Sequence, residues 1–198
     1  ETGIVGNGEK PVDGNGMIVI AARPDLAILG DDGQFMSKPG DEGQLIRTGY
    51  TPIGYYNDPK KSAETFVTIA DRVWVLSGDR ARIAADGSYV MLGRGSQCIN
   101  TGGEKVFAEE VEEIARHYDA VEDVLVVGLP DERWGNKVVA VVEVAAGHSF
   151  DLAAFNEILR GKLSGYKVPK AVYLTEKIKR SPAGKADYPW AKKFATEG

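Results

Sequence analysis

Short apolar runs separated by turn residues fill the first half of the chain, from Glu1 to about Leu92. This texture is typical of antiparallel sheets, because Asp-Gly and Asn-Gly steps between the runs supply residues that tolerate positive φ. A short helix is predicted over Lys60–Phe66, with Pro59 at its first position. The predicted strands are Met17–Ala21, Leu26–Leu29, Gln44–Arg47, Arg72–Leu76 and Tyr89–Leu92.

Beyond Ser96 the pattern changes to alternating helices and strands. One buried helix face is indicated by apolar residues at i, i+3, i+4 and i+7, namely Val111, Ile114, Ala115 and Tyr118. A second helix, with Asp151 as its cap, is marked by Leu152, Phe155, Leu159 and Leu163. The predicted strands are Val121–Leu129, Lys137–Ala145 and Val168–Thr175, followed by a loop and a short final helix.

The predicted fold class is therefore α+β, with two domains. Residues 1–94 would be a β-rich unit, and residues 95–198 a smaller domain with a three-stranded sheet flanked by helices. No low-complexity linker separates them, so we expect a tight hinge at Ser96 and not a flexible tether.

Composition narrows the functional classes. The net charge of −5 comes from 24 basic and 29 acidic residues that are mixed along the chain, so neither nucleic acid nor anionic lipid is an expected partner. The lone Cys98 cannot form an internal disulfide, and no apolar run is long enough to span a membrane. We expect a cytoplasmic protein. The start at Glu1-Thr2-Gly3, without Met, is expected to be a cut end.

Four short motifs carry the candidate chemistry. Each alone is typical of a turn or a solvated loop, so their order and spacing matter more than any one of them. They are Ser77-Gly78-Asp79-Arg80, Gly93-Arg94, Gly102-Gly103-Glu104-Lys105-Val106 and Ser181-Pro182-Ala183-Gly184-Lys185. In this order the chain resembles the adenylate-forming family of acyl-CoA synthetases, peptide-synthetase adenylation domains and luciferases, over nearly its whole length. Gly54–Pro59 and Thr65-Phe66 match a further family signature, and Ile99–Phe107 is most similar to bacterial fatty-acyl-CoA ligases.

The resemblance implies an ATP-dependent ligase that needs Mg²⁺, activates a hydrophobic carboxylic acid as an acyl-adenylate and passes the acyl group to CoA. It implies that Lys185 is the catalytic cation beside the α-phosphate, a role that suits a compact ammonium on a flexible stem. Asp79 would accept hydrogen bonds from the ribose hydroxyls of ATP or AMP, and Arg94 would reach the ribose or a phosphate. Glu1 would help to hold the magnesium ion.

The resemblance also implies a rotating C-terminal domain. Ser96 stands at the hinge, where relatives commonly have Asp or Lys. Gly102 and Gly103 would line the pantetheine tunnel of CoA after rotation, and the alternative for them is a β-turn that needs positive φ. Asn100 replaces a basic residue of some relatives, which puts in doubt a lysine-assisted second step at that position.

The family's phosphate-binding loop and acyl pocket lie upstream of the part that this chain matches. We therefore expect the chain alone to be inactive. Two alternatives stay open: a fatty acyl-AMP ligase that loads a carrier protein, and a non-catalytic interaction module. Peripheral membrane contact by a longer parent enzyme also stays open.

Overall fold

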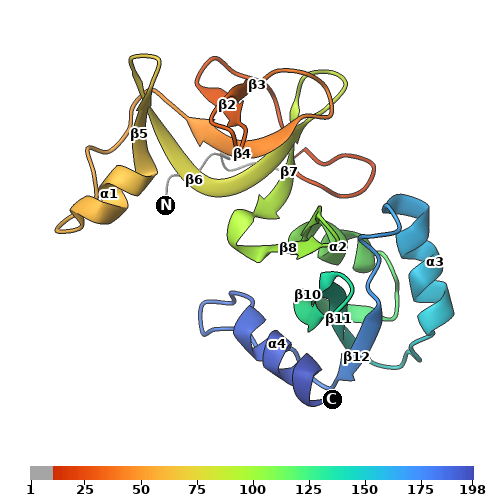
Figure 1. Ribbon diagram of the computed structural model, residues 1–198. Helices are drawn as coiled ribbons and strands as arrows, with labels where there is room; N and C mark the ends of the chain where they lie inside the picture. Colours follow the sequence, from red (N-terminus) through yellow and green to blue (C-terminus); the bar gives the residue numbers. More distant parts are fainter. Residues whose placement is uncertain (1–10) are drawn as a thin grey trace. The chain divides into compact units, whose positions relative to one another are not determined.

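The computed structural model describes residues 11–198, which form two compact units (Figure 1). The first ends at Ser96 and the second is Gln97–Gly198. The short 3-10 helix η1, Gly95–Gln97, contains the unit boundary. Within residues 11–198, no helix is both long enough and apolar enough to cross a bilayer.

The first unit is built on a seven-stranded antiparallel sheet. Its strands are β1 (Val19–Ile20), β2 (Leu26–Leu29), β3 (Phe35–Met36), β4 (Glu42–Arg47), β5 (Phe66–Ile69), β6 (Arg72–Ile83) and β7 (Tyr89–Arg94). They follow the order β1-β7-β6-β4-β2-β3, and β5 pairs with β6. The helix α1 (Pro59–Thr65) starts at an Asp58 cap, as its Asp-Pro step predicts. The buried cluster of this unit consists of Ile28, Leu45, Ala81 and Ile83.

The sequence placed Ser77–Arg80 beyond the end of a strand, and this expectation was wrong. β6 continues through this segment to Ile83. Gly78 has a φ of +82°, and the register of the β4–β6 pairing shifts between Gln44 and Ile46, so that β6 has extra residues between Leu76 and Arg80. A bulge therefore absorbs the glycine and lets the strand continue.

The second unit alternates strands and helices. Its elements are β8 (Cys98–Thr101), β9 (Glu104–Phe107), α2 (Ala108–Ala115), β10 (Val121–Asp131), β11 (Gly135–Val144), α3 (Leu152–Lys162), β12 (Ala171–Thr175) and α4 (Tyr188–Glu197). β10, β11 and β12 form the predicted three-stranded sheet, in which β10 and β11 are antiparallel and β11 and β12 parallel. The β8–β9 hairpin forms a separate two-stranded sheet that the sequence analysis did not predict as strands.

Helices cover both faces of the three-stranded sheet. Alternate residues such as Val124 and Val126 pack with α2 and α3 in one core cluster, whereas Leu125 and Val127 pack with α4 in the other. Figure 1 shows the sheet between these helices. Two buried faces explain why the sequence of β10 is apolar without alternation. The α+β class is confirmed.

The helix faces were predicted only in part. Asp151 Oδ1 accepts hydrogen bonds from the Ala153 and Ala154 N–H groups at 2.7 and 3.3 Å, which confirms the cap. Leu152 is nevertheless 51% exposed, because it lies in the first turn on the solvent side of α3. Tyr118 lies beyond the end of α2 but still packs against the same core. The 3.6-residue period identified the buried face but not where the helix stops.

Candidate functional site

Asp79 and Arg94 meet across two neighbouring strands. They are directly opposed in the β6–β7 pairing, and Arg94 Nε lies 3.6 Å from Asp79 Oδ1. The Asp79 side chain is 25% exposed and that of Arg94 is 71% exposed, so both reach solvent. An exposed pair of this kind adds little to stability. The register therefore brings together two of the residues predicted to bind the nucleotide, in a position open to a ligand.

Gly102 and Gly103 form the two-residue turn of the β8–β9 hairpin. Their φ angles are +59° and +88°, and Thr101 pairs with Glu104 across the turn. Two successive positive φ angles define a type I′ hairpin turn, which glycines favour. The backbone geometry thus shows the β-turn with positive φ that was the alternative for these glycines. Their role towards CoA stays a prediction.

Gly102 is also held close to a tryptophan. Its N–H donates to the Trp134 carbonyl oxygen at 2.8 Å, and a Cβ at position 102 would lie 2.7 Å from the Trp134 ring. A Cβ at Gly103 would meet no atom within 4 Å. Packing against Trp134 therefore requires a glycine at position 102, whereas a side chain at position 103 would extend into open space.

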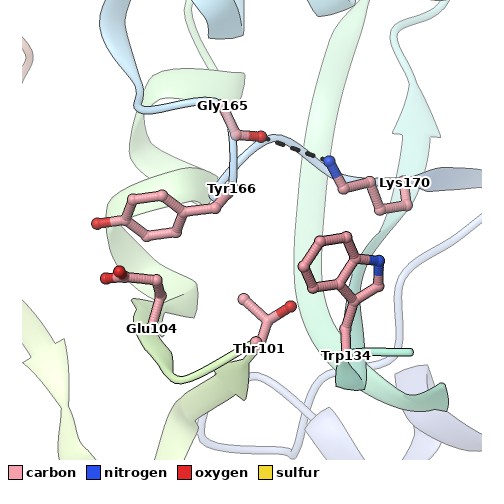
Figure 2. Close-up of a pocket in the computed structure, with 7 residues that line it drawn as sticks. Thr101, Glu104, Trp134, Gly165, Tyr166 and Lys170 are labelled. Atoms are coloured by element: carbon pink, nitrogen blue, oxygen red, sulfur yellow. Dashed lines mark hydrogen bonds between the residues drawn. The ribbon is translucent and has the colours of Figure 1, made fainter. Parts of the chain in front are cut away.

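A pocket of about 250 Å³ lies beside this turn; we call it the Trp134 pocket (Figure 2). It is lined by Thr101, Gly102, Glu104, Trp134, Gly165, Tyr166 and Lys170. Figure 2 shows the Trp134 and Tyr166 rings on different sides of the hollow. Lys170 Nζ donates to the Gly165 carbonyl oxygen at 3.5 Å, and a guanidinium, that of Arg133, lies 4.5 Å from the Trp134 ring. Aromatic faces with nearby cations suit a ligand that has a flat ring and anionic groups.

Lys185 stands on a tight turn between β12 and α4, and we call residues 180–186 the Lys185 turn. Arg180 and Ala186 form an antiparallel bridge at its base. The Gly184 N–H donates to the Ser181 carbonyl oxygen at 2.8 Å, with Gly184 at a φ of +74°. Lys185 is exposed, and its Nζ has no hydrogen-bond or ion-pair partner among residues 11–198. The backbone is fixed while the ammonium stays available.

A buried carboxyl lies beneath the first residue of α4. Glu112 Oε1 accepts from the Val126 N–H at 2.8 Å, and Oε2 accepts from the Tyr188 hydroxyl at 3.2 Å. Burial, opposed by the Val126 hydrogen bond and by Arg116, raises the pKa of Glu112 to about 7. Burial and the charge of Glu112 also raise the pKa of Tyr188, so this phenol stays protonated as a donor.

The remaining predicted positions have these places in the structure. Ser96 lies in η1 at the unit boundary. Glu1, the predicted magnesium ligand, lies outside the described residues. Among residues 11–198 there is no group of three or more His, Cys, Asp or Glu side chains that could hold a metal ion. The proposed Mg²⁺ site thus rests on the family resemblance alone.

Sequence reasoning missed the Trp134 pocket. The available signal was Trp134 in the Asp-Glu-Arg-Trp-Gly turn between two apolar strands, since a large aromatic side chain in a polar turn stays partly exposed and can contact a ligand. Tyr166 and Lys170 carry no comparable signal, because the pocket forms only where three segments distant in sequence meet.

Residues 110–185 match the family described as the AMP-binding enzyme C-terminal domain. This match includes Lys185 at its last position. Residues 110–185 therefore carry the C-terminal domain of AMP-binding enzymes.

Within that class the curated relatives are acyl-CoA ligases. The chain is 44% identical over 198 residues to a medium/long-chain-fatty-acid–CoA/3-oxocholest-4-en-26-oate–CoA ligase of Mycolicibacterium smegmatis, covering 99% of this chain and 35% of the relative. It is 46% identical over 195 residues to the 3-oxocholest-4-en-26-oate–CoA ligase of Rhodococcus rhodochrous, covering 97% and 35%. The chain spans about a third of the length of these relatives.

Solved structures of the class have the same fold. The amide bond synthetase McbA of Marinactinospora thermotolerans superposes with a TM-score of 0.75 at 27% identity, over 86% of this chain and 34% of that one. Apo MatB of Rhodopseudomonas palustris gives 0.72 at 27%, over 90% and 36%.

Proposed function

We propose that this chain is the lid, hinge and adjoining β-rich part of an AMP-forming acyl-CoA synthetase for a hydrophobic carboxylic acid. In this proposal, residues 1–94 belong to the larger AMP-binding domain and residues 95–198 are its mobile C-terminal domain. The names of the relatives favour fatty acids or steroid side-chain acids as the substrate class. ATP and CoA are the co-substrates, and Mg²⁺ accompanies ATP.

The first step joins the acid to AMP. A carboxylate oxygen of the acid attacks the α-phosphorus of ATP, the bond to the β-phosphate oxygen breaks, and pyrophosphate leaves. Negative charge spreads over the α-phosphate oxygens in the transition state, and the Lys185 ammonium stabilises it. Asp79 accepts hydrogen bonds from the ribose hydroxyls, while Arg94 beside it offers a guanidinium to the ribose or a phosphate.

The second step makes the thioester. The CoA thiol loses its proton, its sulfur attacks the carbonyl carbon of the acyl-adenylate, and AMP leaves. In our proposal the Gly102-Gly103 turn borders the path of the thiol, and the Trp134 pocket beside it receives the nucleotide end of CoA. The Trp134 and Tyr166 rings would contact the adenine, and Lys170 would face a phosphate.

One observation carries this proposal. A single compact unit presents two chemically different sites on separate elements: the Lys185 ammonium, which has no partner among residues 11–198, on a hydrogen-bonded turn, and an aromatic pocket beside a two-glycine turn. An acyl-AMP ligase that loads a carrier protein has no need of the pocket, because phosphopantetheine on a protein carries no adenine. The pocket thus favours free CoA as the acceptor.

The test uses two half-reactions in a completed ligase. The completed ligase is the M. smegmatis relative with its 198 aligned residues replaced by the chain described here. Lys185→Ala should slow acyl-adenylate formation about a hundredfold, roughly 3 kcal/mol, by loss of one charge contact in the transition state. It should leave thioester formation from preformed adenylate nearly unchanged. Lys179→Ala, which removes a neighbouring exposed charge, is the control.

Gly103→Leu should do the reverse, obstructing thioester formation while pyrophosphate release stays close to normal. Gly147→Leu is the matched control, because Gly147 has a φ of +80° and equally open surroundings but lies in the β11–α3 connection. Equal loss of both half-reactions in Lys185→Ala and Gly103→Leu would refute the separation of the two sites.

CoA binding can be tested on the chain itself. We expect CoA to quench tryptophan fluorescence and pantetheine, which lacks the nucleotide, to bind much more weakly. Trp134→Phe should remove the signal, whereas Trp190→Phe in α4 should keep it. Equal affinity for CoA and pantetheine would contradict binding of the nucleotide end of CoA in the Trp134 pocket.

A further inference from the structure

The two peptide groups that flank Lys185 Cα are both held by neighbouring residues. On the N-terminal side, the Lys185 N–H donates to Ser181 Oγ at 3.1 Å, and the Gly184 carbonyl oxygen accepts from Arg180 Nη1 at 3.2 Å. On the C-terminal side, the Lys185 carbonyl oxygen accepts from the Ser181 N–H at 2.8 Å. With both peptide planes fixed, the direction of the Lys185 Cα–Cβ bond is fixed as well.

Arg180 joins this turn to the central sheet. Its Nε donates to Asp123 Oδ2 at 2.8 Å and its Nη2 donates to Asp123 Oδ1 at 2.8 Å. Asp123 is in β10, its side chain is 18% exposed, and its Oδ1 also accepts from the Val124 N–H at 2.9 Å. The fork on a carboxylate is the most directional ion pair available to a side chain. The third nitrogen of the same guanidinium reaches Gly184, so one planar group spans the sheet and the turn.

We propose that Arg180, anchored by Asp123, is the positioning residue for Lys185. It does not touch the substrate in this proposal; it sets the place from which the ammonium meets the α-phosphate. This inference rests on the function proposed for Lys185 and extends it to residues that neither the motif nor the comparisons assign.

The physical reason is preorganisation. Lysine has a flexible stem, and each additional freedom of the backbone beneath it lowers the fraction of time that the ammonium spends at the reacting phosphate. A site on a loop needs supporting contacts to hold the accuracy that a helix or strand supplies without them. The Lys185 turn is such a loop, and β10 is the rigid element to which Arg180 ties it.

We call the hydrogen bonds that join Asp123, Arg180 and Gly184 the brace. The first experiment measures its effect in this chain, independently of any activity. Native-state digestion with a lysine-specific protease is followed by mass spectrometry at the Lys185–Ala186 bond. Arg180→Gln and Asp123→Asn should each accelerate this cut about tenfold, as expected for loss of a charge-assisted hydrogen bond between partly exposed groups. Lys179→Gln, which removes an adjacent charge without a brace, should leave the rate at Lys185–Ala186 unchanged.

The second experiment asks whether Arg180 acts through Lys185 in the completed ligase. Arg180→Gln should lower kcat of acyl-adenylate formation about tenfold, with thioester formation from preformed adenylate unchanged. Arg180→Lys should not restore the rate, since an ammonium keeps the charge but cannot form the fork. In a Lys185→Ala background, Arg180→Gln should have no further effect.

The outcomes separate the brace from the proposed function. Unchanged cutting in both Arg180→Gln and Asp123→Asn would overturn the brace. Fully additive losses with Lys185→Ala would overturn positioning, because Arg180 would then act by its own contact. If cutting accelerated but Lys185→Ala left adenylation intact, the brace would stand, and both the role proposed for Lys185 and positioning through it would fall.

Discussion

Replacing Glu112 by Gln should stabilise the second unit at alkaline pH and leave its stability at acid pH nearly unchanged. The Glu112 carboxyl is buried, its side chain being 4% exposed, and its pKa is raised from 4.5 to about 7. Glutamine has almost the same shape and can still accept from the Val126 N–H. It carries no charge, so it escapes the cost of burying one.

The sign follows from proton binding. Below pH 4.5 the carboxyl is protonated in both the folded and the unfolded chain. Between 4.5 and about 7 only the folded state keeps the proton, so the free energy of unfolding falls as the pH rises, and above about 7 the full cost of burying the charge is present. At about 1.4 kcal/mol per pKa unit, the ionised carboxylate destabilises the fold by about 3 kcal/mol as an upper limit.

The assay is urea unfolding at about pH 5.5 and about pH 8, followed by tryptophan fluorescence, with stabilities taken from the transition that reports Trp134 and Trp190. Glu112→Gln should exceed the wild-type chain by about 3 kcal/mol at the higher pH and by only about 1.4 kcal/mol at the lower, where the unfolded but not the folded carboxyl has lost its proton. Glu113→Gln, on the exposed side of the same helix, is the control and should shift neither. An equal loss of stability at both pH values in Glu112→Gln would show that the buried group is not ionised at neutral pH at such a cost, and the reasoning would fail.

Three further predictions concern the whole chain and the hairpin turn. Given ATP, Mg²⁺ and a panel of acids, the 198-residue chain alone should release no pyrophosphate above background; clear turnover by ligase-free protein would contradict this. Limited proteolysis should leave a stable fragment of about 100 residues that begins near Ser96, whereas cuts in the middle of the second unit with Ser96 protected would argue against independent folding. Gly102→Ala should destabilise the second unit by about 1–3 kcal/mol, more than Gly103→Ala, because only its Cβ meets Trp134; equal urea midpoints for the two variants would speak against the close contact.

Much of the fold could be predicted from local pattern. Leu26–Leu29 was predicted with its observed bounds, because turn residues delimit it on both sides. The runs in β10 and β11 were recognisable because burial on both faces leaves them almost wholly apolar. The Asp151 cap needed only the adjacent residues. In each case the sequence signal is contained in a few consecutive residues.

What could not be predicted depends on pairing between distant segments. Gly78 is typical of a turn, and only the pairing of β6 with β4 and with β7 keeps it inside a strand. The approach of Asp79 to Arg94 is set by the register of β6 and β7, which no single motif encodes. Trp134 could be suspected from its exposed turn, but its neighbours in the pocket could not. The tunnel role of the two glycines and the hinge role of Ser96 stay predictions.

The pairing of β1 with β7 has a consequence for synthesis on the ribosome. Val19 finds its partner only when Val90 has been made and has left the exit tunnel. At about 5–20 residues per second this delay is on the order of several seconds. During that time the first strand has no ladder, and the edge of β6 that β7 will occupy stays open to other chains. The β10–β11 hairpin, in contrast, can close as soon as it emerges. Codon changes that slow translation between Val19 and Val90 should therefore lower the soluble yield of this protein more than equal delays placed after Gln97.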